Sequence, residues 1–332
     1  MHAIRQHEFG PAETLRYEEM PDPEPREGQV RIAVEAAGVH LIDTAIRRGE
    51  AWGYPVPELP MVPGREVAGR VEALGAGVAD GWRGRRVVVH LGPVSGGYAE
   101  RAVASVDALH EIPDRIAADA AVAAIGTGRT AVAILEIAAL RSADVVLVTA
   151  AAGGLGSLFV QAALGIGASV VGAAGGPEKA ERVRALGATL AVDYLEHGWT
   201  ERVGESLGER EPTIVLDGVG GSVGREALSL LGVGGRMVLF GWSSGEPTQI
   251  STRDLMGRGL TVTWALGQRP SRERQRELER RALDEVASGR LAPVTQRFPL
   301  ADAAAAHAAL EARGTVGKTV LVPARQAHHD GG

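Results

Sequence analysis

Residues 144–156, which read DVVLVTAAAGGLG, decide the fold of this chain. Residues 144–150 form an apolar run without a polar face, which is typical of a strand buried on both sides of a parallel sheet. The run leads into Gly153, Gly154 and Gly156 and then into the helical pattern of residues 157–165. Small residues at such a turn let the backbone approach a pyrophosphate, whose charge the helix N-terminus receives. The stretch therefore predicts a dinucleotide-binding loop.

Similar apolar runs follow this loop along the chain. They occupy residues 169–172, 213–217 and 235–240, and helical patterns lie between them. Alternation of buried strands with helices predicts a doubly wound α/β unit around a parallel sheet.

The first third of the chain has a different pattern of polar and apolar residues. Residues 29–36, 66–73 and 85–90 alternate in polarity with period two, as half-buried strands do. We expect a mainly β domain of Greek-key or barrel type there. Near the other end, the pattern predicts helices over residues 271–289 and 302–312 and a strand over residues 316–322.

Composition excludes several classes of function. The 332 residues include 35 basic and 41 acidic side chains, a net charge of −6, and no cysteine. Without a basic run, binding to nucleic acid or to an acidic membrane is not expected, and without cysteine there is no disulfide, thiolate nucleophile or Cys-based zinc site. Because residues 1–6 lack the apolar core of a signal peptide, we expect a cytoplasmic protein.

The identity of the dinucleotide depends on the region after the second buried strand. An NAD site usually has a carboxylate about 20 residues after the loop, which binds the ribose 2′-OH, but residues 169–177 contain none. Lys179, one of only two lysines, lies instead in the first turn of a helix that Pro177 opens. A cation there opposes the helix dipole by ~0.3–1 kcal/mol, which favours an anion between them. We therefore predict NADPH, with its 2′-phosphate near Lys179.

Five motifs carry a family resemblance. They are GVHLIDT at 38–44, PGREVAG at 63–69, GGYAE at 96–100, AAAGGLG at 150–156 and GKTVL at 317–321. In this order they resemble the zinc-independent quinone oxidoreductases, the zeta-crystallin-like branch of the medium-chain dehydrogenase/reductase superfamily. The resemblance implies a Rossmann NADPH-binding domain over residues 121–264, and a split, mostly β GroES-like catalytic domain over residues 1–120 and 265–332.

The resemblance also implies an activity. Members of the family transfer hydride from NADPH to a quinone or to an α,β-unsaturated carbonyl, without zinc and commonly as homodimers. Two alternatives stay open on the same fold: an enoyl reductase dedicated to one biosynthetic intermediate, and a non-catalytic NADPH-binding sensor. The expected partner is a small quinone or enone, with no nucleic acid and no membrane.

Cofactor and pocket residues follow by matching positions. The resemblance places the cofactor contacts at Thr130, Gly154, Leu155, Lys179, Tyr194, Phe240, Gly241, Ser243 and Arg313, and the loop itself adds Gly153. Ala45 and Ala51 stand where bacterial relatives carry tyrosines, which would enlarge the acceptor pocket. We expect Trp52, Tyr54, Trp242 and Trp264 to line that pocket.

His40 is the candidate catalytic residue. Hydride transfer needs positioning, charge stabilisation on the acceptor oxygen and then a proton, and an imidazole titrates near neutral pH. His40 would donate that proton or a hydrogen bond; the alternative is that it only packs beside the cofactor. Lys318, in the last predicted strand, is interpreted as structural or solvent-exposed, and His307 as structural.

No metal is expected. The zinc branch carries a catalytic Cys near His40 and a His in a Gly-His-Glu motif, but here residues 64–66 read GRE. His40, Asp43 and Glu66 offer three donors in principle, yet Arg65 among them would repel a cation.

A serine hydrolase is a remote alternative. Residues 220–224 and 241–245 match the Gly-x-Ser-x-Gly nucleophile motif, and Asp254 and His307 follow in the chain order of an α/β-hydrolase triad. No oxyanion loop of the His-Gly-Gly type precedes them, and such matches are common in a chain with 45 glycines.

Overall fold

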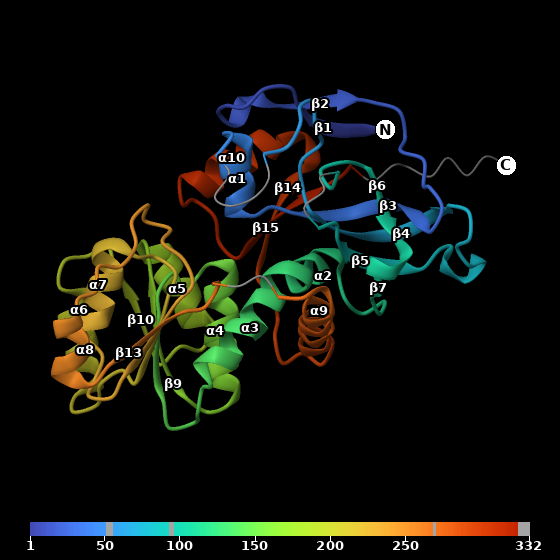
Figure 1. Cartoon of the computed structure of the whole chain (residues 1–332). Coiled ribbons are helices and arrows are strands. Elements are labelled where there is room, and N and C mark those ends of the chain that lie inside the picture. Colours follow the sequence, from blue (N-terminus) through green and yellow to red (C-terminus); the bar gives the residue numbers. More distant parts are fainter. Residues whose placement is uncertain (51–55, 93–95, 268–269, 325–332) are drawn as a thin grey trace. The chain divides into compact units, whose positions relative to one another are not determined.

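The structure is a computed structural model that describes residues 1–50, 56–92, 96–267 and 270–324 (Figure 1). It consists of two compact units. Unit 1 contains Met1–Gly126 together with Thr295–Gly332, and unit 2 contains Thr127–Val294.

Unit 2 is built on a six-stranded sheet. Its strands are β8 (Val145–Val148), β9 (Ser169–Ala174), β10 (Leu190–Asp193), β11 (Ile214–Asp217), β12 (Arg236–Leu239) and β13 (Thr261–Trp264). All neighbours pair in parallel, in the order β10-β9-β8-β11-β12-β13. This is the strand order of a Rossmann fold, so the prediction is confirmed. The chain reverses direction across the sheet between β8 and β11, where such folds bind their ligands.

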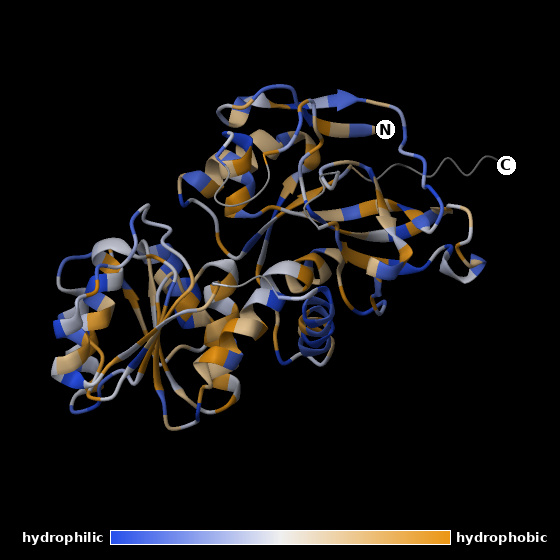
Figure 2. Ribbon diagram, viewed as in Figure 1, coloured by the Kyte–Doolittle hydropathy of each residue, from blue (hydrophilic) through white to orange (hydrophobic). Residues whose placement is uncertain are grey.

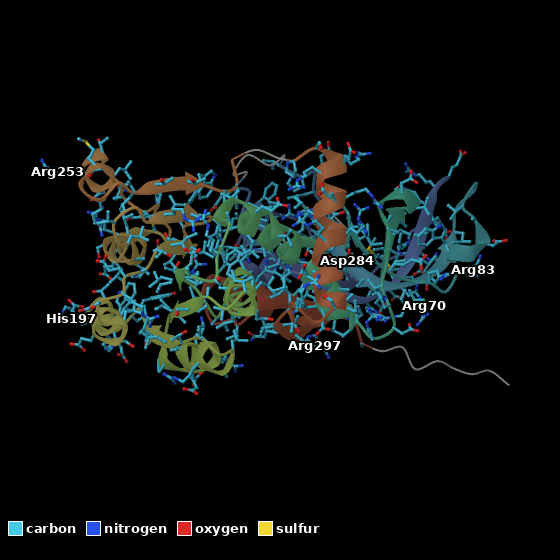
Figure 3. All side chains as sticks on the ribbon, turned by 90° about the horizontal axis from the view of Figure 1, so that it is seen from below. Arg70, Arg83, His197, Arg253, Asp284 and Arg297 are labelled. Carbon is cyan, nitrogen blue, oxygen red and sulfur yellow. The ribbon has the colours of Figure 1, made fainter. Side chains whose placement is uncertain are left out.

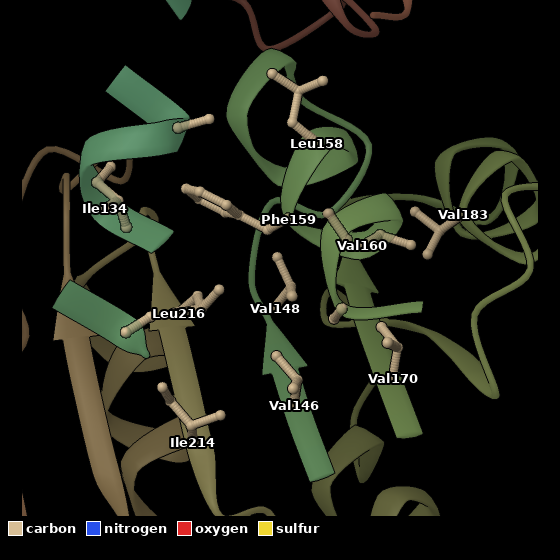
Figure 4. Close-up of a cluster of buried hydrophobic side chains, with 14 of the residues drawn as sticks. Ile134, Val146, Val148, Leu158, Phe159, Val160, Val170, Val183, Ile214 and Leu216 are labelled. Carbon is tan, nitrogen blue, oxygen red and sulfur yellow. The ribbon is translucent and has the colours of Figure 1, made fainter. Parts of the chain in front are cut away.

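Helices cover both faces of this sheet. They are α3 (Arg129–Ala138), α4 (Gly154–Gly165), α5 (Pro177–Ala185), α6 (Trp199–Leu207), α7 (Gly221–Ser229) and α8 (Thr252–Arg258). Alternate side chains of β8 point to opposite faces of the sheet. Val146 and Val148 pack with Phe159 of α4 (Figure 4), and Leu147 packs with α6 and α7. Each fully buried side chain of this kind contributes about 1.5–3 kcal/mol. The apolar run that identified β8 therefore reflects burial from both sides.

The helix predicted over residues 271–289 is α9 (Arg272–Ala287), and it belongs to unit 2. Leu278 and Ala282 pack on Val132 of α3, and Arg129 forms a 3.0 Å ion pair with Glu279. Its remaining surface is strongly hydrophilic (Figure 2). Because of these contacts, the second boundary between the units lies after residue 294. We expected it between residues 264 and 265, which would have put α9 in unit 1.

Unit 1 combines the N-terminal strands with the C-terminal end of the chain. Its elements are β1 (His2–Gln6), β2 (Leu15–Glu19), β3 (Gln29–Gly38), α1 (Leu41–Arg47), β4 (Glu66–Leu74), β5 (Arg86–His90), β6 (Arg101–Ser105), β7 (His110–Glu111), α2 (Ala118–Ala123), β14 (Thr295–Pro299), α10 (Ala303–Glu311) and β15 (Lys318–Val322). The sheet order is β14-β15-β3-β4-β5-β7, and β6 also pairs with β3. β15 pairs antiparallel with the end of β3, so the last strand completes the sheet of the first domain, as the split-domain prediction requires.

Charged side chains lie at the periphery of both units. Figure 3 shows Arg70, Arg83 and Arg297 of unit 1 and His197, Arg253 and Asp284 of unit 2 pointing outward, and all six are exposed. One helical stretch among the described residues, Ala118–Ala138, is long and apolar enough to cross a membrane by length and composition. In this structure 61% of its apolar window is buried, as in a core helix.

Candidate active site and cofactor-binding residues

The loop between β8 and α4 brings the helix unusually close to the strand. α4 begins at Gly154, with Gly153 as its N-cap. A Cβ atom at Gly156 would lie 2.2 Å from the carbonyl oxygen of Ala150, so only glycine fits there. Ala150 itself has a φ of 49°, a left-handed conformation that costs a non-glycine residue about 1–3 kcal/mol. The first-turn N–H groups, including that of Leu155, are therefore presented at the carboxyl end of β8, the arrangement that a pyrophosphate needs.

The ends of β9 and β10 meet beside this loop. Asp193 accepts hydrogen bonds from the backbone N–H of Gly176 at 2.8 Å and from that of Leu195 at 2.9 Å, which ties the two strand ends together. A Cβ at Gly175 would lie 2.9 Å from the hydroxyl of Tyr194, so the ring lies directly against this backbone. α5 starts at Pro177, as predicted, and Lys179 is in its first turn. The structure thus brings Tyr194 and Lys179 to the same sheet edge.

The ends of β11 and β12 form the other half of that edge. Phe240 packs edge-on against Phe159, with ring centroids 5.1 Å apart, and a Cβ at Gly218 would lie 2.3 Å from its ring. The N–H of Ser243 donates to the carbonyl oxygen of Gly218 at 3.0 Å. Gly241 lies between them, packed on Gly218.

A buried network at the switch point was not predicted from the sequence. Asp217 accepts from the hydroxyls of Thr149 at 2.6 Å and Thr248 at 2.8 Å. Thr149 in turn accepts from the N–H of Gly218 at 3.0 Å. The only sequence signal was an aspartate at the end of an otherwise apolar strand.

The other predicted residues are distributed over the chain. Trp242 and Trp264 are brought together, with ring centroids 5.1 Å apart, and both remain exposed, at 46% and 40%. Thr130 lies in the first turn of α3. Arg313 follows α10 in unit 1 with a φ of 57°. Trp52 and Tyr54 lie outside the described residues.

His40 of unit 1 belongs to a cluster of three charged or titratable groups. Its Nε2 atom lies 2.6 Å from Oε1 of Glu66 and 2.7 Å from Nζ of Lys318, and Nζ lies 3.1 Å from Oε2 of Glu66. The side chain of His40 is 24% exposed, whereas those of Lys318 and Glu66 are 4% and 0% exposed. Lys318 is therefore buried, and the reading that it could be solvent-exposed is corrected: the residue starts β15 and its side chain points inward to Glu66.

Burial and charge act in opposite directions on this cluster. Burial by itself would raise the pKa of Glu66, but His40 and Lys318 outweigh it and hold that pKa well below its ordinary value. Burial lowers the pKa of the Lys318 ammonium, and Glu66 offsets only part of this effect. Glu66 therefore stays ionised, and Lys318 releases its proton more easily than an exposed lysine does.

A second buried network adjoins His40. Asp43 accepts from the backbone N–H of His40 at 2.8 Å and forms a 3.1 Å ion pair with Arg65. The hydroxyl of Tyr98 donates to Asp43 at 3.3 Å and lies 3.2 Å from Nε2 of His307. Burial lowers the pKa of His307 to about 4, so this histidine is neutral and structural.

The hydrolase alternative receives no support from the geometry. Asp254 caps α8 through Ser251 and accepts from Arg225 at 2.6 Å. His307 is held by Tyr98 and Arg47 inside unit 1. Asp254 and His307 are therefore engaged in other contacts. Gly220 and Gly221 lie at the start of α7, with φ values of 71° and 53°.

Among the described residues, no three His, Asp or Glu side chains are grouped so as to hold a metal ion.

Comparison with known proteins places the chain in a family. Residues 26–114 match the alcohol dehydrogenase GroES-like domain, and residues 154–287 match a domain described as zinc-binding dehydrogenase. A quinone oxidoreductase of Pseudomonas aeruginosa is 35% identical over 321 residues, which cover 95% of this chain and 97% of the relative. The chain belongs to the quinone oxidoreductase family. The family match confirms the resemblance recognised in the sequence, and the second domain match extends to the end of α9, in agreement with the unit boundary seen here.

Two further relatives bear on chemistry. A 2-haloacrylate reductase of a Burkholderia species is 33% identical and covers 96% of this chain and 97% of its own length. The crystal structure of Escherichia coli quinone oxidoreductase complexed with NADPH superimposes with a TM-score of 0.82 at 31% identity, covering 97% of this chain and all of that chain.

Proposed function

We propose that this protein is an NADPH-dependent reductase that transfers hydride to a quinone or to an α,β-unsaturated carbonyl without using a metal. The observation that carries the proposal is the carboxyl edge of the unit 2 sheet. There, the tight approach at Gly156 and the start of α4 lie at the switch point of a Rossmann fold, and Lys179 and Tyr194 follow the neighbouring strands β9 and β10.

The residues present fit NADPH. The first-turn N–H groups of α4 would bind the pyrophosphate, and Lys179 of α5 together with Tyr194 would bind the 2′-phosphate. When bound, NADPH supplies a hydride to the acceptor carbon. Family relationship, including a relative solved with NADPH, supports this assignment. The remaining proposed contacts are Thr130, Gly153, Gly154, Leu155, Phe240, Gly241, Ser243 and Arg313.

Metal independence is supported by the charged cluster of unit 1. The ammonium of Lys318 lies against both His40 and Glu66, where it already supplies a positive charge. A divalent cation at the same carboxylate would have to displace that ammonium and to tolerate Arg65, which is paired with Asp43 nearby.

Both acceptor classes are kept in the proposal because the relatives include quinone oxidoreductases and a reductase named for 2-haloacrylate, an α,β-unsaturated acid. The exposed rings of Trp242 and Trp264 are 5.1 Å apart and tilted by 31°, and they offer an aromatic surface for a planar acceptor. Trp52 and Tyr54, which lie outside the described residues, stay proposed contacts of the acceptor. We expect a cytoplasmic homodimer that acts on small molecules.

The decisive assay measures loss of reduced-nicotinamide absorbance with NADPH, and separately with NADH, against a panel of benzoquinones, naphthoquinones, cyclic enones and acrylates. The proposal expects turnover that is faster with NADPH and that ranks the acceptor classes. Tight NADPH binding with no turnover on any acceptor would contradict it and would favour the sensor alternative.

A further inference from the structure

Two threonine–aspartate pairs connect β8 with β11 in unit 2, one at each end of these strands. At the amino end, the hydroxyl of Thr213 donates to Asp144 at 2.7 Å. At the carboxyl end, the hydroxyl of Thr149 donates to Asp217 at 2.6 Å. Because the two pairs share the same chemistry, a difference in their roles must come from their surroundings.

The pair at the amino end holds the strands together. Thr213 also accepts from the backbone N–H of Val145 at 3.1 Å. Asp144 accepts from the backbone N–H of Arg141 at 2.8 Å and from the side chain of Arg236 at 3.2 Å. These contacts close the turn before β8 and give the carboxylate a cationic partner, so the needs of the sheet explain this pair.

The pair at the carboxyl end binds a loop as well as a strand. Asp217 and Thr149 are both fully buried. The Asp217 carboxylate also accepts from the backbone N–H groups of Val219 at 3.0 Å and Gly220 at 3.3 Å, and from the hydroxyl of Thr248 at 2.8 Å. A buried carboxylate is costly unless hydrogen bonds satisfy it, and here two hydroxyls and two backbone N–H groups do so. The carboxylate thereby fixes the backbone of the loop that follows β11.

The loop after β11 is joined to the loop after β12. Backbone hydrogen bonds of 2.8–3.0 Å connect residues 218–221 with residues 243–246, and Thr248 adds its bond to Asp217 from the end of the second loop. The first turns of α7 leave room for that bond. A Cβ at Gly224 would lie 2.1 Å from Oγ1 of Thr248 and 2.6 Å from Oδ2 of Asp217. One buried carboxylate therefore organises both loops.

The position of these loops corresponds to one half of a dinucleotide. In the order of the sheet, β11 and β12 lie on one side of β8, and β9 and β10 lie on the other. Lys179 and Tyr194, which we propose to bind the 2′-phosphate, follow β9 and β10. With the pyrophosphate at the start of α4, the nicotinamide half of NADPH would extend toward the ends of β11 and β12.

We propose that Asp217 is a positioning residue for the nicotinamide half of NADPH. Together with Thr149 and Thr248 it fixes the two loops in the arrangement that this half requires. These loops contain Phe240 and Ser243, which are among the proposed cofactor contacts. The inference rests on the proposed function and deepens it, because it separates the groups that hold the nicotinamide half from those that hold the adenosine half.

The first test measures binding to the full-length protein by calorimetry, without an acceptor. The probes are NADPH and 2′,5′-ADP, which carries the adenosine and the 2′-phosphate but no nicotinamide. Thr149→Val leaves both Asp217 and the N–H of Gly218 without the hydroxyl that they share. The affinity for NADPH should fall by about 10-fold in this variant, and the affinity for 2′,5′-ADP should stay within about twofold of the wild type.

Thr213→Val is the matched control, because it removes the hydroxyl of the other pair at the opposite end of the same strands. Both valine variants should lower the midpoint of denaturant-induced unfolding, but Thr213→Val should leave both affinities unchanged. Thr149→Ser keeps the hydroxyl and should bind NADPH like the wild type. An unchanged affinity for NADPH in Thr149→Val, or an equal loss for NADPH and 2′,5′-ADP, would overturn the proposal.

The second test disturbs the same network by volume and keeps its polar groups. In Gly224→Ala the new Cβ must displace Thr248 from Asp217, so the affinity for NADPH should fall while that for 2′,5′-ADP is kept. Gly204→Ala, in α6 and open to space, is the control and should bind both probes normally. If Gly224→Ala binds NADPH as tightly as the wild type, the network does not position the cofactor.

The two proposals fail in distinguishable ways. Wild-type protein that binds NADPH but reduces no acceptor contradicts the proposed function, while the affinities of the variants still test Asp217. Normal wild-type turnover with unchanged NADPH affinity in Thr149→Val and Gly224→Ala contradicts the role of Asp217 alone. Wild-type protein that does not bind NADPH contradicts both.

Discussion

The two units present chemistry in contrasting ways. At the sheet edge of unit 2, the groups that we propose to bind the cofactor are mainly backbone N–H groups, arranged by glycines and strand ends. In unit 1, the charged cluster consists of the side chains of His40, Glu66 and Lys318, which come from three distant parts of the chain.

This difference affects what a substitution does. A backbone site depends on close approach, so it is damaged by an added methyl group. A side-chain cluster depends on where protons and charges lie, so it is damaged by charge changes and by anything that fills the space around them.

The largest effect is expected for Gly156→Ala. The added Cβ would meet the backbone of Ala150 at 2.2 Å, which must push α4 away from β8. A displacement of this size should weaken NADPH binding by about 10²-fold, measured by calorimetry. Gly165→Ala, at the other end of α4 and open to space, is the matched control and should bind normally. Equal affinities in the two variants would contradict a backbone-built site.

Lys179→Ala tests the one cation that unit 2 is proposed to contribute. Loss of a charge-assisted contact worth roughly 1.5–3 kcal/mol should reduce the preference for NADPH over NADH by about 10- to 100-fold. Arg184→Ala removes an exposed cation about one and a half turns further along α5 and should leave the preference intact. The ratio of the two dissociation constants in each variant gives the answer; an unchanged ratio in Lys179→Ala would remove this residue from the site.

Gly126→Ala tests the space reserved in unit 1. The new Cβ would overlap Oε1 of Glu66, and overpacking of this kind costs about 1–3 kcal/mol. The midpoint of denaturant-induced unfolding should fall accordingly. Gly81→Ala, where a Cβ meets open space, serves as the control. If both variants unfold at the wild-type midpoint, the carboxylate is not confined as described.

The smallest effect concerns pH. The folded pKa of His307, about 4, lies below its ordinary value of 6.5, so the unfolded chain binds more protons between these values and stability falls as the pH falls. Between pH 7 and 5.5 this histidine should account for about 1 kcal/mol of lost stability. We expect His307→Gln to lose less stability over that interval than the wild type in denaturant titrations. An identical loss in both proteins would contradict the neutral, buried role.

Sequence patterns predicted unit 2 well because its determinants are local. The apolar run of β8, the glycines that follow and the position of Lys179 lie within about 35 residues of each other, and strand periodicity and helix starts are local properties. The helix α9 was placed in the wrong unit, since its assignment depends on packing against Val132 and Arg129, which lie far away in the chain.

The sequence indicated only part of the cluster of unit 1. His40 was recognised, but Glu66 and Lys318 are 252 residues apart, and only the antiparallel pairing of β15 with β3 brings Lys318 to the carboxylate. The scarcity of lysine drew attention to Lys318, yet a lysine at the start of a strand gives no sign of its burial. Asp217 was missed for the same reason, because its partners Thr149 and Thr248 come from other strand ends.

The central claim is that a backbone-built cofactor edge and a metal-free charged cluster together suffice for reduction. Its most direct test is NADPH oxidation by protein that has been treated with a strong chelator and shown by mass spectrometry to hold no stoichiometric metal. We expect an unchanged rate with the best acceptor of the panel, still faster with NADPH than with NADH. Loss of activity on chelation, with recovery on addition of zinc, would contradict it.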